Sequence, residues 1–200
     1  MNSIKDLEEE IKKICENYKD DAIGGWAMGS GPIPCDILFI GEAPGKTEVE
    51  EGKPFVGAAG KNFQYYLDMI NLNRKDIRIT NTCYFRPIKI KTSSSGRKTI
   101  SNRPPKTSEI NLFQHILKKE IETVNPKIII TLGNTPLKTF DNYNATIGHR
   151  HGSLLFSEKL NMHIFPMYHP SALIYNRTDS FKESYKEDWC KLADILKGFK

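Results

Sequence analysis

Residues 36–45 read DILFIGEAPG, and this stretch decides the fold. Asp36–Ile40 is a short apolar run that ends directly in a Gly/Pro turn, which is typical of a strand entering a loop. Three more runs of this kind follow along the chain, at Arg78–Cys83, Lys127–Leu132 and His163–Met167. The loops that follow them contain the motifs NTCYFRP, GNTP and YHPSAL. The sequence therefore predicts four strands, each followed by a loop of distinctive composition.

Helical stretches lie before, between and after these strands. They are predicted at roughly Ser3–Tyr18, Gly60–Ile70, Ser108–Val124, Thr135–Phe140 and Phe181–Leu196. Strands that alternate with helices indicate a parallel sheet covered on both faces. We therefore predict an α/β protein, a three-layer α/β/α sandwich with a four-stranded parallel sheet, formed by residues 1–200 as a single domain. Such sheets bind ligands beyond the carboxyl ends of their strands, so the four loops are expected to converge on one crevice.

Composition excludes a membrane-spanning protein. The longest apolar stretches are far too short to cross a bilayer. The first twenty residues alternate charged and apolar positions without the apolar core of a signal peptide, so they predict a helix. We expect a cytoplasmic monomer.

The basic residues are distributed unevenly. The net charge is +5 and the pI about 8.9, which is only mildly basic. The segment from Arg86 to Lys106, however, carries seven cations and no acidic residue. Such a run is either a solvated, flexible loop or a surface that binds phosphates, and we favour phosphates. Within it, Thr92–Gly96 is predicted to be a mobile loop tip.

Several motifs occur together in a fixed order. GEAPG at 41–45 precedes GKPFVG at 52–57, and Asn81, an LGN at 132–134 and HPSAL at 169–173 follow. With these motifs the chain resembles the uracil-DNA glycosylase superfamily, in particular its family-four enzymes, from about Ile37 to Asp188. The resemblance implies a DNA repair enzyme that flips uracil out of single- or double-stranded DNA and hydrolyses its N-glycosidic bond, leaving an abasic site.

The resemblance also assigns residues to the base. Phe55 matches the family's stacking phenylalanine, and an aromatic face holds a flipped base by about 1–3 kcal/mol. Asn81 suits base reading, because its amide can accept a hydrogen bond from uracil N3–H and donate one to O4. Cytosine presents the reverse pattern and would leave these groups unpaired. The alternatives are a core phenylalanine and an asparagine that caps the strand.

The chemistry is expected to rest on His169 and Glu42. A positioned imidazole can donate to uracil O2 as negative charge develops there, and Pro170 keeps His169 in an extended loop. Glu42 can polarise a water molecule and favour a cationic sugar. Many superfamily members carry an aspartate where this chain has Ala43, which would line the substrate site. Catalysis would therefore depend mainly on stabilising the leaving group.

The remaining assignments concern specificity and DNA contacts. Glu48 resembles the residue that crowds the uracil 5-position and excludes thymine. Ser171 suits a phosphate contact, and Leu173 suits a wedge that fills the vacated base stack, or else an apolar anchor for its loop. The cations expected to contact DNA are Arg97, Lys98 and Arg103.

The chain departs from the family at the iron–sulfur cluster. Family-four enzymes carry four cysteine ligands, but only Cys15 matches one of these positions. Tyr18, Phe85 and Phe113 occupy the other three, which suggests that a packed apolar patch replaces the cluster. We predict no cluster, no other cofactor and no metal, and we interpret the cysteines as ordinary thiols.

Gly96–Ser101 resembles a basic loop in a related branch that binds uracil-DNA covalently through a histidine. Ser101 stands at that position here, and a serine without a partnered base is a poor nucleophile, so turnover is expected. Alternatives are a protein that traps uracil-DNA, and a glycosylase for another deaminated base such as hypoxanthine. A nucleotide-binding module is disfavoured, because GEAPG lacks the phosphate-binding patterns of such folds.

Overall fold

The computed structural model describes residues 4–140 and 146–199. Its main sheet has five strands in the order β3-β2-β6-β8-β7. β2, β3, β6 and β8 run parallel, and β7 pairs with β8 antiparallel at the edge. The strands are β2 (Ile37–Gly41), β3 (Arg78–Asn81), β6 (Ile128–Leu132), β7 (Leu155–Ser157) and β8 (Met162–Met167). The four predicted parallel strands are confirmed. The prediction missed β7, which is only three residues long and has no clear alternating pattern.

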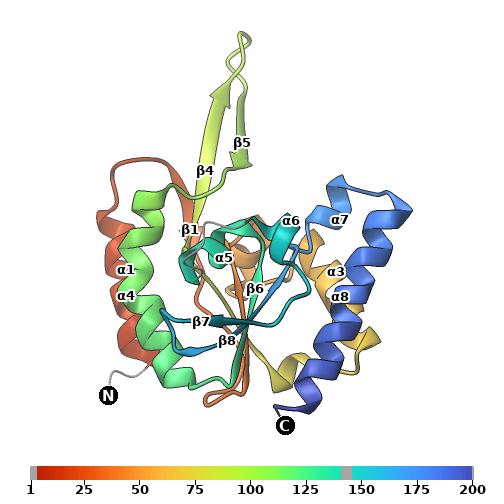
Figure 1. Ribbon diagram of the computed structural model, residues 1–200. Coiled ribbons are helices and arrows are strands. Elements are labelled where there is room, and N and C mark those ends of the chain that lie inside the picture. Colours follow the sequence, from red (N-terminus) through yellow and green to blue (C-terminus); the bar gives the residue numbers. More distant parts are fainter. Residues whose placement is uncertain (1–3, 141–145, 200) are drawn as a thin grey trace.

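Helices cover both faces of this sheet, so the predicted three layers are confirmed (Figure 1). One layer contains α3 (Ala58–Met69) and α8 (Asp179–Lys197), and the opposite layer contains α1 (Ile4–Asn17) and α4 (Thr107–Val124). The shorter helices are α2 (Lys46–Glu51), η1 (Arg74–Asp76), α5 (Asn134–Phe140), α6 (Ile147–Arg150) and α7 (Ala172–Tyr175). The helix predictions hold to within about two residues, although Ser3 lies outside the described residues. Among the residues described, no helix has the length and apolar character needed to cross a membrane.

Side chains alternate between the two faces of the strands and so build two cores. Phe39 of β2 packs in the core formed with α3 and α8, where Trp189 is fully buried. Leu38 and Ile40 point the other way, into the core formed with α1 and α4. Because β2 is buried on both faces, it reads as a continuous apolar run in the sequence.

A buried ion pair fixes β3 against α4. Glu120 of α4 is fully buried and accepts hydrogen bonds from Arg78 at 2.6 and 2.8 Å, from Thr80 at 2.9 Å and from Tyr84 at 2.6 Å. A buried pair of this kind adds little net stability, but breaking it would leave an uncompensated charge. The pair therefore sets the position of β3, whose last residue is Asn81.

A second sheet, of order β1-β4-β5, stands apart from the first. It contains β1 (Ile23–Trp26), β4 (Phe85–Thr92) and β5 (Lys98–Asn102), and β4 and β5 form a hairpin that projects from the body (Figure 1). Of the two interpretations of Arg86–Lys106, the flexible loop is therefore wrong for most of the segment, and the favoured phosphate-binding surface stays a prediction. Residues 88–92, IKIKT, alternate apolar and polar side chains, which is typical of a strand. The prediction overlooked this alternation because it considered only the positive charge of the segment.

Candidate active site

A pocket of about 780 Å³ opens at the carboxyl edge of the main sheet. It is lined by the loops after β2, β6 and β8 and by the last residue of β3, so the expected convergence of loops is observed. The predicted site residues in its wall are Glu42, Ala43, Glu48, Phe55, Asn81, Arg103, His169 and Ser171. Leu173, Arg97 and Lys98 are not part of the lining.

Phe55 adopts an unusual backbone conformation, with φ of 54°. The left-handed region costs a residue with a side chain about 1–2 kcal/mol, so something must hold Phe55 there. Arg74 donates hydrogen bonds to the carbonyl groups of Pro54, at 3.2 Å, and of Phe55. The Phe55 ring lies 5.4 Å from the His169 ring, measured between centroids. Strained residues of this kind cluster at ligand sites.

Asn81 and Phe55 approach each other over Gly41. A Cβ atom at Gly41 would lie 2.5 Å from the Asn81 side-chain oxygen and 3.0 Å from the Phe55 ring. Any side chain at this position would therefore displace the amide or the ring. Asn81 is 5% exposed, and within residues 4–140 and 146–199 its side-chain amide has no hydrogen-bond partner. The amide is available to a ligand in the pocket.

His169 is held in one tautomer. The Ser171 backbone N–H donates to His169 Nδ1 at 3.2 Å, and Ser171 Oγ lies 2.7 Å from the same nitrogen. Because Nδ1 accepts, the neutral ring carries its proton on Nε2. Burial lowers the pKa of His169 from 6.5 to about 4, because desolvation disfavours the cation. The imidazole is therefore a neutral donor at pH 7.

Two carboxylates line the same pocket. Glu42 accepts a hydrogen bond from the hydroxyl of Thr135, a residue at the start of α5 that sequence reasoning missed. Glu48 accepts one from the Gly57 backbone N–H at 2.8 Å, which ties α2 to the PFVG segment. Each carboxylate is thus oriented by a hydrogen bond, Glu42 from a residue distant in sequence and Glu48 from the nearby PFVG segment.

The comparisons with known proteins agree with this geometry. The family model of the uracil DNA glycosylase superfamily matches residues 28–193. The chain is 32% identical to a type-4 uracil-DNA glycosylase of Sulfurisphaera tokodaii, over 98% of this chain and 86% of that protein. It is 30% identical to one of Archaeoglobus fulgidus, over 98% and 94%, and 32% identical to one of Saccharolobus solfataricus, over 98% and 88%.

The chain belongs to the uracil-DNA glycosylase superfamily. The matched region covers all four parallel strands and every loop that lines the pocket. The resemblance seen in the motifs is therefore confirmed over nearly the whole chain.

Leu173, the residue expected to act as a wedge, packs towards the protein core. Leu173 is half-buried and lies against the core formed with α3 and α8. Tyr175, two residues on, is 85% exposed and lines the pocket mouth. A wedge role for Leu173 stays a prediction, and the observed packing suits its alternative as an apolar anchor of the loop.

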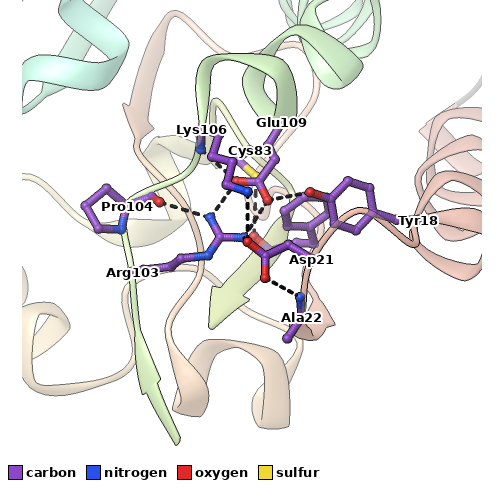
Figure 2. A network of polar contacts seen from close by, with 9 residues as sticks. Tyr18, Asp21, Ala22, Cys83, Arg103, Pro104, Lys106 and Glu109 are labelled. Carbon is purple, nitrogen blue, oxygen red and sulfur yellow. Dashed lines mark hydrogen bonds and ion pairs between the residues drawn. The ribbon is translucent and has the colours of Figure 1, made fainter. Parts of the chain in front are cut away.

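Arg103 is engaged by acidic residues within the protein (Figure 2). Its guanidinium forms two hydrogen bonds with Glu109, at 2.6 and 2.7 Å, and an ion pair with Asp21 at 3.2 Å. Glu109 is fully buried and also accepts from the Tyr18 hydroxyl at 2.7 Å. Burial alone would raise the pKa of Glu109, but the hydrogen bonds from Arg103 and Tyr18 outweigh it and lower the pKa. A phosphate contact by Arg103 remains a prediction, and its visible role is to join β5 to α4.

The positions that would hold the family's iron–sulfur cluster do not supply four thiolates. Tyr18 and Phe85 pack with ring centroids 4.9 Å apart, and Phe85 and Phe113 lie 5.3 Å apart. Cys15 is buried beside them, and burial raises the pKa of its thiol to about 12. In the described part of the chain no three His, Cys, Asp or Glu residues form a metal-binding group. The donor set does not fit a cluster, and its absence remains a prediction.

Proposed function

We propose that this protein is a DNA repair glycosylase that hydrolyses the N-glycosidic bond of uracil in DNA and leaves an abasic site. The observation that carries the proposal is the neutral His169, which can donate from Nε2 in the same pocket as Phe55 and the unpaired Asn81 amide. The type-4 uracil-DNA glycosylases that resemble the chain support the same activity.

Substrate binding follows from the chemistry of the pocket. A base inside a duplex is inaccessible, so uracil must be flipped outward at a cost of a few kcal/mol. The flipped ring stacks on Phe55, while the Asn81 amide accepts from N3–H and donates to O4. Glu48, which lines the pocket, is assigned to the wall beside uracil C5, where it would disfavour the added methyl group of thymine.

The proposed reaction is a hydrolysis of the N-glycosidic bond in which uracil is the leaving group. The bond between C1′ and N1 breaks, its electron pair goes to uracil, and the sugar develops cationic character. His169 Nε2–H donates a hydrogen bond to uracil O2. This hydrogen bond strengthens as negative charge develops on O2 while the glycosidic bond breaks. Glu42, oriented by Thr135, holds the water that bonds to C1′ and accepts one of its protons. The uracil anion then takes a proton from solvent.

The trapping alternative requires a nucleophile in the pocket. Ser101, the residue at the position of the covalent histidine, is exposed on β5 and does not line the pocket. This location favours release of the product over a stable adduct.

The proposal is tested with an end-labelled oligonucleotide that contains one uracil. After incubation, alkali cleaves the strand wherever an abasic site has formed. We expect cleavage with uracil and none with thymine at the same position, and no protein–DNA adduct on a denaturing gel. Uncleaved uracil substrate refutes the proposal, whereas cleavage of a hypoxanthine substrate alone assigns another deaminated base.

A further inference from the structure

The β4–β5 hairpin is exposed along nearly its whole length. Every residue from Lys89 to Asn102, here called the arm, is exposed, and among the described elements β5 pairs only with β4. The Ser93 backbone N–H donates to the Arg97 carbonyl at 3.0 Å and closes the turn, in which Gly96 has φ of 79°. A two-stranded hairpin without a core is marginally stable on its own. Contact with a binding partner would stabilise the arm.

The cations of this region fall into two groups. At the base of the arm, Arg103 pairs with Glu109 and Asp21, and Lys106 pairs with Asp21 at 2.9 Å. Within the arm, no ion pair with another described residue is found for the four cations Lys89, Lys91, Arg97 and Lys98. Acidic residues are absent from the arm itself. The arm therefore presents four uncompensated positive charges.

The strand register distributes these charges over both faces. Residues directly opposite each other on antiparallel strands share a face. Lys89 and Lys91 lie opposite Ser101 and Thr99 and so occupy one face. Lys98 lies opposite Thr92, on the other face, together with the cross-strand pair Ile90 and Ile100. Arg97 is at the turn.

The arm is joined to the pocket. Pro87, Asn102, Arg103 and Pro104, at its base, are part of the pocket lining. The arm rises from the same edge of the molecule that carries α6 and α7 (Figure 1). The base of the arm therefore forms part of the wall of the pocket that would receive the flipped nucleotide.

We propose that the arm binds the DNA duplex beside the flipped nucleotide by entering a groove between its two phosphate strands. This inference rests on the proposed function. Phosphates flank a groove on both sides, and the arm carries cations on both faces and at its tip. A two-stranded ribbon fits the major groove, which is about 12 Å wide. Ile90 and Ile100, 49% and 56% exposed, contact its apolar surface, such as thymine methyl groups. A single strand offers only one line of phosphates, so the arm favours duplex DNA.

The test compares two variants from which the same positive charge has been removed. In the arm variant, Lys89, Lys91, Arg97 and Lys98 are replaced by Ala. In the control variant, the exposed Lys5, Lys13, Lys118 and Lys159, which lie outside the pocket lining, are replaced instead. Binding is measured for a uracil-free duplex and for a single strand of the same sequence, at several salt concentrations.

We expect the affinity of the arm variant to fall at least tenfold more for the duplex than for the single strand. The slope of log affinity against log salt should become shallower by about 0.9 for each duplex phosphate that the arm no longer neutralises. The control variant should keep the parent's slope. Equal duplex binding by the two variants overturns the proposal. Since the duplex lacks uracil, this result does not depend on excision, which the alkaline cleavage assay reports separately.

The isoleucine pair gives a second measurement. Ile90→Thr with Ile100→Thr keeps the strand propensity and removes the apolar contact. Duplex affinity should fall several-fold at an unchanged salt slope. If sedimentation instead shows that the parent is a dimer and this variant a monomer, the arm binds a second copy of the chain and the duplex proposal is wrong.

Discussion

Replacing His169 with Ala removes the hydrogen-bond donor that the proposed mechanism assigns to the uracil leaving group. The neutral ring presents Nε2–H to the pocket because Nδ1 is occupied by Ser171. Removal of one donor to a developing anion typically costs about 10²–10³ in rate, or about 2.7–4 kcal/mol. We expect His169→Ala to lower the single-turnover rate by this factor while uracil-DNA binding changes little.

The pH dependence of excision follows from the burial of His169. Burial lowers the pKa of His169 from 6.5 to about 4, because desolvation disfavours the cation. The ring therefore stays neutral from pH 8 to about pH 5, and the excision rate should show no histidine titration near pH 6.5. Since the folded pKa lies below the unfolded one, the stability contribution of His169 is complete above pH 6.5. It is lost as the pH falls towards 4.

The rate loss of His169→Ala and the flat pH profile of the parent are both measured by single-turnover excision between pH 5 and 8. His163→Ala serves as the control, because it removes an exposed imidazole outside the pocket lining. A His169→Ala rate within a few-fold of the parent would assign the leaving-group contact to another residue. A step near pH 6.5 that disappears in His169→Ala would show that the ring acts as a cation.

Three further outcomes are expected. Asn81→Asp should lower uracil excision and shift selectivity towards cytosine, because a carboxylate repels uracil O4 but accepts from the cytosine amino group; full uracil activity in paired oligonucleotide assays would show that Asn81 only caps its strand. Arg74→Gln should raise the KM for uracil-containing DNA about tenfold with a smaller change in kcat, since Phe55 can then relax from its left-handed conformation. An unchanged KM would show that the strain at Phe55 does not contribute to substrate binding. The purified protein should contain no stoichiometric iron by elemental analysis, and iron with thiolate absorbance near roughly 400 nm would show that the cluster positions are misassigned.

The parallel strands and the long helices could be predicted because their signals are local. Apolar runs such as Asp36–Ile40 and the periodic pattern of Phe181–Leu196 determine burial within a few residues of sequence. The hairpin was not predicted, since the cations Arg86, Lys89 and Lys91 of β4 drew attention to phosphate binding and away from its alternating pattern. β7 is too short to produce any pattern.

The sequence by itself determined which chemical groups stand at the carboxyl edge of the sheet, because each motif directly follows a strand and parallel strands end on one side. Only the tertiary structure decided how those groups are held. Thr135 orients Glu42 across 93 residues, and Tyr18 reaches Glu109 across 91. Arg74, which follows α3 in the sequence, holds Phe55, which precedes that helix. Such contacts join residues that are distant in sequence, and their partners are set by packing of the layers, which no local pattern encodes.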